Sequence, residues 1–197
     1  MSMQFRVPAI SREVEFIAQY TAEADAVYNG EIRVPEAVKE LTKAVYDRAE
    51  DDIKDLLHVL QEEVKRAVQG LLRIRWVGGD LGGRAEGYGP IYNAHGRKKQ
   101  TGWVGIYLGH YDMALRLFGW VSPKGGLDGR RKLARACTGK ITGVRVVSDH
   151  RKDYPEWVED CVVWFDRKLT LKDSRDELRT EVGLCAKRFF KIAKRYL

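Results

Sequence analysis

Two acidic residues follow the last two apolar segments that could form strands, and their spacing could hold a divalent metal. Asp149 comes shortly after the valine-rich segment 144–147, and Asp166 directly follows the apolar segment 162–165. Carboxylates on neighbouring strands can bind Mg²⁺, which activates water for attack on a phosphodiester. Lys168, two residues after Asp166, would share its face of a regular strand and stabilise the developing charge. Together they form a candidate catalytic site.

In outline, this Asp…Asp-x-Lys arrangement followed by a helix resembles that of the PD-(D/E)xK nucleases. Such a resemblance would imply metal-dependent cleavage of nucleic acid. The sequence departs from the pattern at two points: no proline precedes Asp149, and Arg167 would put a positive charge beside the metal. We therefore keep the nuclease as the alternative hypothesis and favour a protein without catalytic activity.

A basic loop flanked by aromatic residues suggests a different chemistry. Arg97, Lys98 and Lys99 lie between two predicted strands, 87–93 and 102–108, which also carry Trp103 and three tyrosines. Lysine and arginine neutralise phosphates, and exposed aromatic rings give bases a surface to stack on. The alternative is a solvated hairpin tip whose aromatic side chains face the core.

Further cations extend this candidate binding surface. Arg84 lies beside a glycine pair, and the predicted helix 127–137 carries a basic cluster consisting of Arg130, Arg131, Lys132 and Arg135. Within that cluster, Arg131 and Arg135 are four residues apart and would lie on one helix face. These residues could bind nucleic acid or an acidic face of a protein that handles nucleic acid, as in an inhibitor or accessory factor.

The distribution of charge along the chain supports an acidic partner. Residues 1–70 carry 9 Lys and Arg against 14 Asp and Glu, whereas residues 71–197 carry 26 against 14. Most of the excess lies in residues 71–152, with 16 basic residues against 5 acidic ones. Such segregated charge favours binding to nucleic acid or to an acidic protein surface.

No familiar cofactor motif is present. The segment 78–89 contains six glycines but has neither a Gly-Lys-Ser/Thr tripeptide nor a GxGxxG pattern, so a nucleotide cofactor is not expected. The four histidines and three cysteines show no zinc-ligand spacing, and we predict no metal site in the favoured hypothesis. The odd cysteine count favours reduced thiols.

The elements that must position these residues are predicted from periodicity. Apolar residues recur every three or four positions from 35 to 70, without proline or glycine between Pro35 and Gly70, which predicts a long helix. It is either continuous or broken once near the acidic residues 50–52. A helix from Ser11 to Tyr28 precedes it, and a helix with a capping box at Ser174 and Glu177 closes the chain. Between them, Arg73 and Arg75 alternate with apolar residues, as in a strand with one wet face.

We thus predict an α+β fold in which N-terminal helices and a C-terminal helix pack against an antiparallel-leaning sheet of about five strands. Residues 1–70 would form an acidic helical segment and residues 71–197 a basic α+β core, together in one compact domain. Residues 111–118 are predicted as a short helix or turn. No membrane span or signal peptide is predicted, which favours a cytoplasmic protein. The regular stripe of the 35–70 helix also allows a homodimer.

Overall fold

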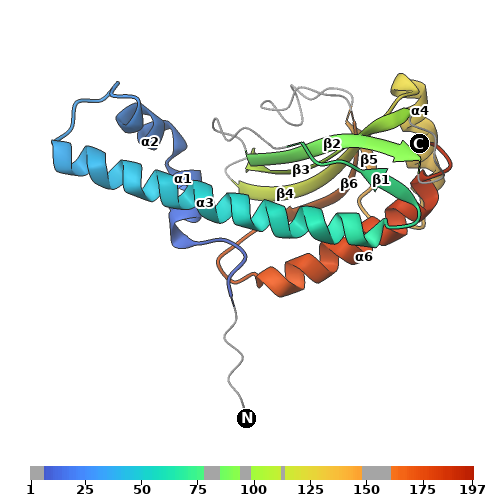
Figure 1. Cartoon of the computed structure of the whole chain (residues 1–197). Helices are drawn as coiled ribbons and strands as arrows, with labels where there is room; N and C mark the ends of the chain where they lie inside the picture. Colours follow the sequence, from blue (N-terminus) through green and yellow to red (C-terminus); the bar gives the residue numbers. More distant parts are fainter. Residues whose placement is uncertain (1–6, 78–84, 94–98, 112–113, 148–160) are drawn as a thin grey trace, which may run out of the picture.

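A six-stranded antiparallel sheet forms the centre of the computed structural model, which describes residues 7–77, 85–93, 99–111, 114–147 and 161–197. The helices are α1 (Arg12–Gln19), α2 (Thr21–Tyr28), α3 (Glu36–Ala67), α4 (Gly126–Cys137) and α6 (Arg175–Ala193). The strands are β1 (Leu72–Ile74), β2 (Ala85–Asn93), β3 (Gln100–Tyr111), β4 (Ala114–Pro123), β5 (Arg145–Val147) and β6 (Cys161–Lys168). The α+β class is confirmed, with six strands rather than five (Figure 1).

The strand order is β1-β2-β3-β4-β6-β5, and every neighbouring pair is antiparallel. The first four strands follow one another in space as they do in sequence. The chain then passes through α4 and adds β5 at the outer edge, so that β6 returns between β4 and β5. Helices α3 and α6 lie side by side along one face of this sheet (Figure 1).

The predicted long helix is confirmed as one continuous α-helix of 32 residues. At 1.5 Å per residue it is about 48 Å long, and it runs along the sheet beside β2 and β3. Its buried residues, Ala49, Leu56, Leu57, Leu60 and Val64, begin near its middle, and four of the five lie in its second half. The first half projects beyond the sheet and carries α2 beside it (Figure 1). In the described part of the chain, no helix combines the length and the apolar composition of a membrane span.

The helix predicted from Ser11 to Tyr28 is wrong in one respect, because it is interrupted at Tyr20. Ser11 caps α1 as expected, accepting a hydrogen bond from the Val14 amide at 3.2 Å. Tyr20 leaves the helical region with φ −124° and ψ 37°. The Thr21 hydroxyl donates to the Ile17 carbonyl at 2.8 Å, so a side chain takes the carbonyl that an unbroken helix would pair with the Thr21 amide.

The short helix or turn predicted at residues 111–118 is also wrong, because most of this segment belongs to β4. An inner strand covered on both faces loses the polar–apolar alternation that identifies a strand from sequence. Leu117 faces the helices while Phe118 faces the opposite side, and both are buried.

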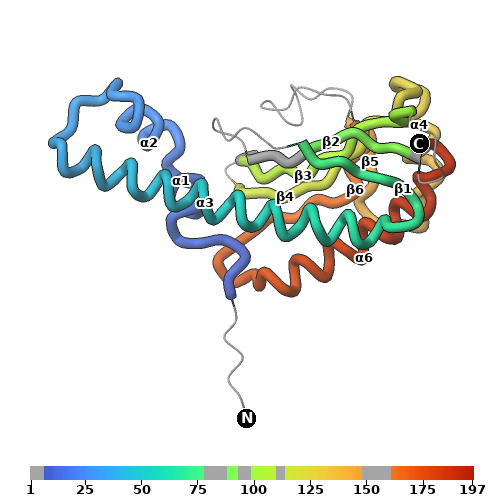
Figure 2. Tube along the Cα trace, viewed as in Figure 1, coloured from blue at the N-terminus to red at the C-terminus, as the bar shows by residue number. Residues whose placement is uncertain are grey.

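The main core lies between the sheet and α3 and α6. Leu60 and Val64 of α3 and Phe189 of α6 are fully buried there, together with Trp164 from β6. Helix α6 begins after Ser174 as predicted, but the Ser174 side chain makes no capping hydrogen bond, so that part of the prediction is wrong. Instead, the backbone of the N-terminal segment pairs with this turn at Pro8 and Ser174, where blue and orange tube meet (Figure 2).

A second apolar cluster occupies the other face of the sheet and contains only strand residues among those described. Its members are Tyr107, Phe118, Trp120, Val147, Cys161 and Val163, with Tyr88 packed against them. Glycines make room for the rings. A Cβ atom at Gly105 would stand 2.1 Å from the Trp120 ring, and one at Gly109 would stand 2.1 Å from the Tyr107 ring.

We predict that Gly105→Ala destabilises the fold by about 1–3 kcal/mol, since the added methyl group would displace the packed Trp120 ring. Urea denaturation measures the effect. Gly129→Ala in α4 is the matched control, because its Cβ would meet only Pro123 Cγ at 3.9 Å. The control should be neutral or stabilising by up to about 1 kcal/mol. Equal stability of the two variants would contradict the packing described here.

Candidate nucleic-acid interface

Strand register places arginine and aromatic side chains on the sheet face opposite α3 and α6. Residues directly across an antiparallel pair project from the same face. Arg73 lies opposite Tyr92, and the Arg75 amide donates to the Pro90 carbonyl at 3.2 Å. Pro90 in turn lies opposite Trp103, and Tyr88 opposite Gly105. We call Arg73, Arg75, Tyr88, Tyr92 and Trp103 the arginine–aromatic patch.

The two arginines of this patch are exposed. Arg73 and Arg75 alternate with Leu72 and Ile74, which turn towards the helices, so both guanidinium groups must project from the opposite face. Among the described residues, neither arginine makes an ion pair. The alternation in the sequence predicts the wet face of these two arginines, but it does not show which other side chains share that face. The predicted binding residues therefore do not include Arg73 and Arg75.

The aromatic members are only partly covered. Trp103, predicted as a binding residue, is 38% exposed, and its ring centroid lies 6.0 Å from that of Tyr88. Tyr88 and Tyr92 are both half-buried. The hypothesis that these rings simply fill the core therefore does not describe Trp103, whereas it does describe Tyr107, which is 1% exposed.

More cations surround the end of the sheet at which β2 ends and β3 begins. Lys99 is exposed there, and Lys124 is held nearby by a 3.1 Å hydrogen bond from its amide to the Thr101 carbonyl. Of the other residues predicted for this surface, Arg84, Arg97 and Lys98 lie outside the described residues.

Helix α4 follows directly from Lys124 and lies beyond this end of the sheet (Figure 1). Arg131 and Arg135 are exposed one turn apart, as predicted. Lys132 is exposed but pairs with Asp128 at 2.7 Å, and this hydrogen-bonded pair lowers the pKa of the Asp128 carboxyl. Arg130 is only 9% exposed, so it lies on the inner side of the helix, away from solvent. We define the basic end as Arg73, Arg75, Lys99, Lys124, Arg131 and Arg135.

Of the candidate catalytic residues of the alternative hypothesis, Asp166 and Lys168 lie on the same sheet face, nearer the opposite edge. Asp149 lies outside the described residues. Asp166 is engaged at both oxygens, since Arg116 Nη2 lies 2.8 Å from Oδ1 and Arg145 Nη2 lies 2.7 Å from Oδ2. Lys168 is exposed and lies opposite Arg116 rather than paired with Asp166. Within the described residues, no group of three or more His, Cys, Asp or Glu could hold a metal ion.

A β-bulge explains how Asp166 reaches its two arginines. Gly119 pairs with Phe165 and Trp120 with Val163, which leaves Trp164 as an extra residue in β6. Both Trp164 and Phe165 therefore project towards the helices, and Asp166 projects from the same face as Val163. Regular alternation would have placed Asp166 with Trp164 in the main core.

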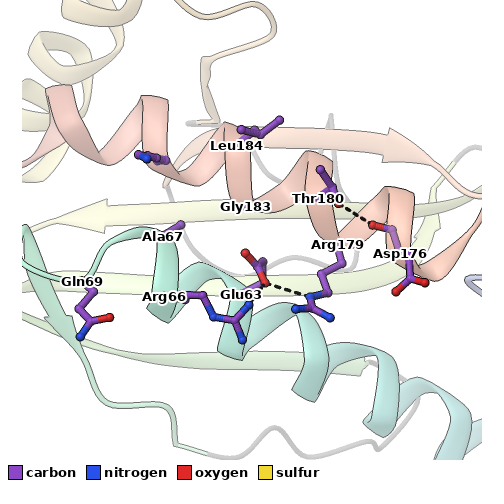
Figure 3. Close-up of a pocket in the computed structure, with 10 residues that line it drawn as sticks. Glu63, Arg66, Ala67, Gln69, Asp176, Arg179, Thr180, Gly183 and Leu184 are labelled. Atoms are coloured by element: carbon purple, nitrogen blue, oxygen red, sulfur yellow. Dashed lines mark hydrogen bonds and ion pairs between the residues drawn. The ribbon is translucent and has the colours of Figure 1, made fainter.

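An open groove of about 800 Å³ lies elsewhere, between α3 and α6 (Figure 3). Its centre is Glu63, which pairs with Arg66 at 2.8 Å and with Arg179 at 2.9 Å. A Cβ atom at Gly183 would stand 2.9 Å from the Glu63 side chain, so the two helices approach closely here. Because two arginines already neutralise its carboxylate, this groove is better explained as the seam of two packed helices than as a reactive site.

The three cysteines are free thiols in this structure. Burial raises the pKa of the Cys137 and Cys185 thiols above their usual value. Since the thiolate is the nucleophile, a raised pKa makes these two cysteines poor candidates for covalent catalysis at neutral pH.

Comparison with known proteins finds no family model that matches the chain, and no significantly similar curated protein or solved structure.

We predict that Asp166→Asn lowers the free energy of unfolding by about 1–3 kcal/mol. Removing one partner of a fully buried ion pair costs about 3–5 kcal/mol. The expected loss is smaller here because Arg116 and Arg145 are partly exposed. Urea denaturation with Asp128→Asn as the control tests this, since the fully exposed Asp128–Lys132 pair should contribute nothing measurable. An unchanged stability of Asp166→Asn would leave that carboxylate available for other chemistry and strengthen the nuclease hypothesis.

Proposed function

We propose that this protein is a non-catalytic binding protein whose basic end engages nucleic acid. The observation that carries the proposal is the gathering of six exposed cations from β1, the start of β3, the end of β4 and α4 around one end of the sheet. Among the described residues, no acidic side chain pairs with any of these six. A cluster of exposed cations of this kind attracts a polyanion, whose counterions are released on binding.

Nucleic acid fits this surface better than an acidic protein face does. Both partners would satisfy the cations, but only nucleic acid also offers bases that can use the exposed Trp103 ring. An inhibitor or accessory factor of a nucleic-acid machine, acting through an acidic protein surface, remains the other form of the binding hypothesis. We place the protein in the cytoplasm, where either partner would be accessible.

The metal-dependent nuclease is the less supported alternative. Binding a metal would require Asp166 to release at least one of the two guanidinium groups that it now accepts hydrogen bonds from. Losing these guanidinium groups would leave a negative charge unpaired on a carboxylate that is only 10% exposed, which would destabilise the fold. We therefore propose that Asp166 has a structural role.

Replacing Arg97, Lys98 and Lys99 together by alanine is expected to weaken nucleic-acid binding and to reduce its salt dependence. Each lost phosphate contact lowers the slope of log K against log salt by about 0.7–0.9. Fluorescence anisotropy over a range of salt concentrations measures both quantities. The control is the triple alanine variant of Lys187, Arg188 and Lys191, exposed cations of α6, which covers the opposite face of the sheet. Binding that is flat with salt, or equal loss in both variants, would contradict the proposal.

We also propose that the homodimer predicted through the 35–70 helix uses only the first half of α3. Its second half is committed to the core, whereas Val38 is 45% exposed and Leu41 is 65% exposed. Phe16, Tyr20, Tyr28 and Ile32 of the neighbouring segments are exposed as well. Apolar surface concentrated in this way is typical of a protein-binding region.

Leu41→Glu should therefore convert a dimer into a monomer, because it places a charge in the centre of the apolar stripe. Sedimentation equilibrium measures the mass of each variant. Leu184→Glu on α6 is the control, since Leu184 is 53% exposed but lies outside the stripe. A wild-type protein that stays monomeric at high concentration would contradict the dimer.

A further inference from the structure

The arginine–aromatic patch restricts the kind of nucleic acid that can bind, and this inference rests on the proposed function. We propose that the patch binds single-stranded nucleic acid, with a base stacked on Trp103 and the adjoining phosphates held by Arg73 and Arg75. The argument uses the position of Trp103 within the sheet, the spacing of the arginines, and the exposure of each side chain.

Trp103 is too far inside the sheet for a duplex to reach. It lies on β3, which has β2 and β1 on one side and β4, β6 and β5 on the other. Six strands spaced by about 4.8 Å give a surface about 24 Å wide, twice the about 12 Å width of the major groove. The sheet therefore cannot enter a groove, and a duplex lying on it would present phosphates alone.

A single strand can meet the same surface with its bases. Unpaired bases turn away from their backbone and stack on aromatic rings, which is how sheet surfaces bind single-stranded RNA and DNA. The Trp103 ring is 38% exposed, and the Tyr88 ring lies 6.0 Å away at an angle of 49°. Tyr88 thus supports one side of Trp103 and leaves part of its surface open to a base.

The arginines lie at the distance that such a strand requires. Arg73 and Arg75 are two residues apart on one face, about 7 Å along the strand, and β1 lies two strand spacings, about 10 Å, from β3. A phosphate beside either guanidinium group would therefore have Trp103 within reach of its base. Tyr92, directly opposite Arg73, offers a second, half-buried ring in the same row.

Fluorescence anisotropy tests whether the full chain prefers a single strand to a duplex. One oligonucleotide sequence is used in both forms. DNA and RNA forms of the strand are compared, since both offer unpaired bases. We expect the wild-type protein to bind the single strand at least ten-fold more tightly than the duplex. Trp103→Ala should weaken single-strand binding by about ten-fold and leave duplex binding unchanged. Trp103→Phe, which keeps an aromatic ring, should restore most of the loss.

Two further variants separate the patch from general electrostatics. Arg73→Ala with Arg75→Ala should weaken binding of both forms and lower the salt slope. Lys65→Ala with Arg66→Ala, which removes the same charge from α3, should change neither. Far-ultraviolet circular dichroism and thermal denaturation check that each variant folds.

The outcomes are distinct. If the duplex binds as tightly as the single strand and Trp103→Ala has no effect, the single-strand inference is wrong while binding through the basic end stands. If neither form binds at low salt, both proposals are wrong.

Discussion

Trp164 fills the space between β6 and α6, and the arrangement of both sheet faces depends on how it is accommodated. Its ring stacks with Phe189 at a centroid distance of 6.0 Å and meets Phe190 edge-on at 5.6 Å. The neighbouring strand makes room for it, since a Cβ atom at Gly119 would stand 2.4 Å from the ring. The bulge at this point also reverses the alternation of β6, because one extra residue is accommodated on the helix side.

That reversal determines which side chain of β6 projects from the other face of the sheet. Asp166 arrives beside Arg116 and Arg145 and ties β4, β5 and β6 together by ion pairs. The same face carries Trp120 and Tyr107, whose rings lie over glycines of β3. These two rings fit against the sheet because Gly105 and Gly109 lack a Cβ atom. The Trp120 and Tyr107 rings are thus buried at the centre of this face, whereas the Trp103 ring, near the end of the sheet, stays exposed.

The two ends of the molecule therefore differ in chemistry. The basic end gathers exposed arginines, lysines and one exposed tryptophan around the sheet, while the first half of α3 with α1 and α2 carries most of the exposed apolar residues. The separation follows the sequence, since residues 1–70 hold an excess of acid and residues 71–152 an excess of base. In the proposed function, one end binds nucleic acid while the other remains available for a second copy of the chain.

Local features of the sequence were enough to determine the elements whose signal is local. The stretch without proline or glycine between residues 35 and 70 determined α3, Ser11 determined the start of α1, and the alternation of Arg73 and Arg75 with Leu72 and Ile74 determined the wet side of β1. Periodicity within one element decides each of these. Only the tertiary structure decided that Trp103 shares a face with Arg73, that Arg130 turns inward, that residues 114–118 form an inner strand, and that Asp166 meets arginines from two other strands. Those outcomes depend on strand order and on one bulged residue. Pairing between segments that are distant in the sequence determines which side chains lie together, and residue spacing within one segment cannot predict that pairing.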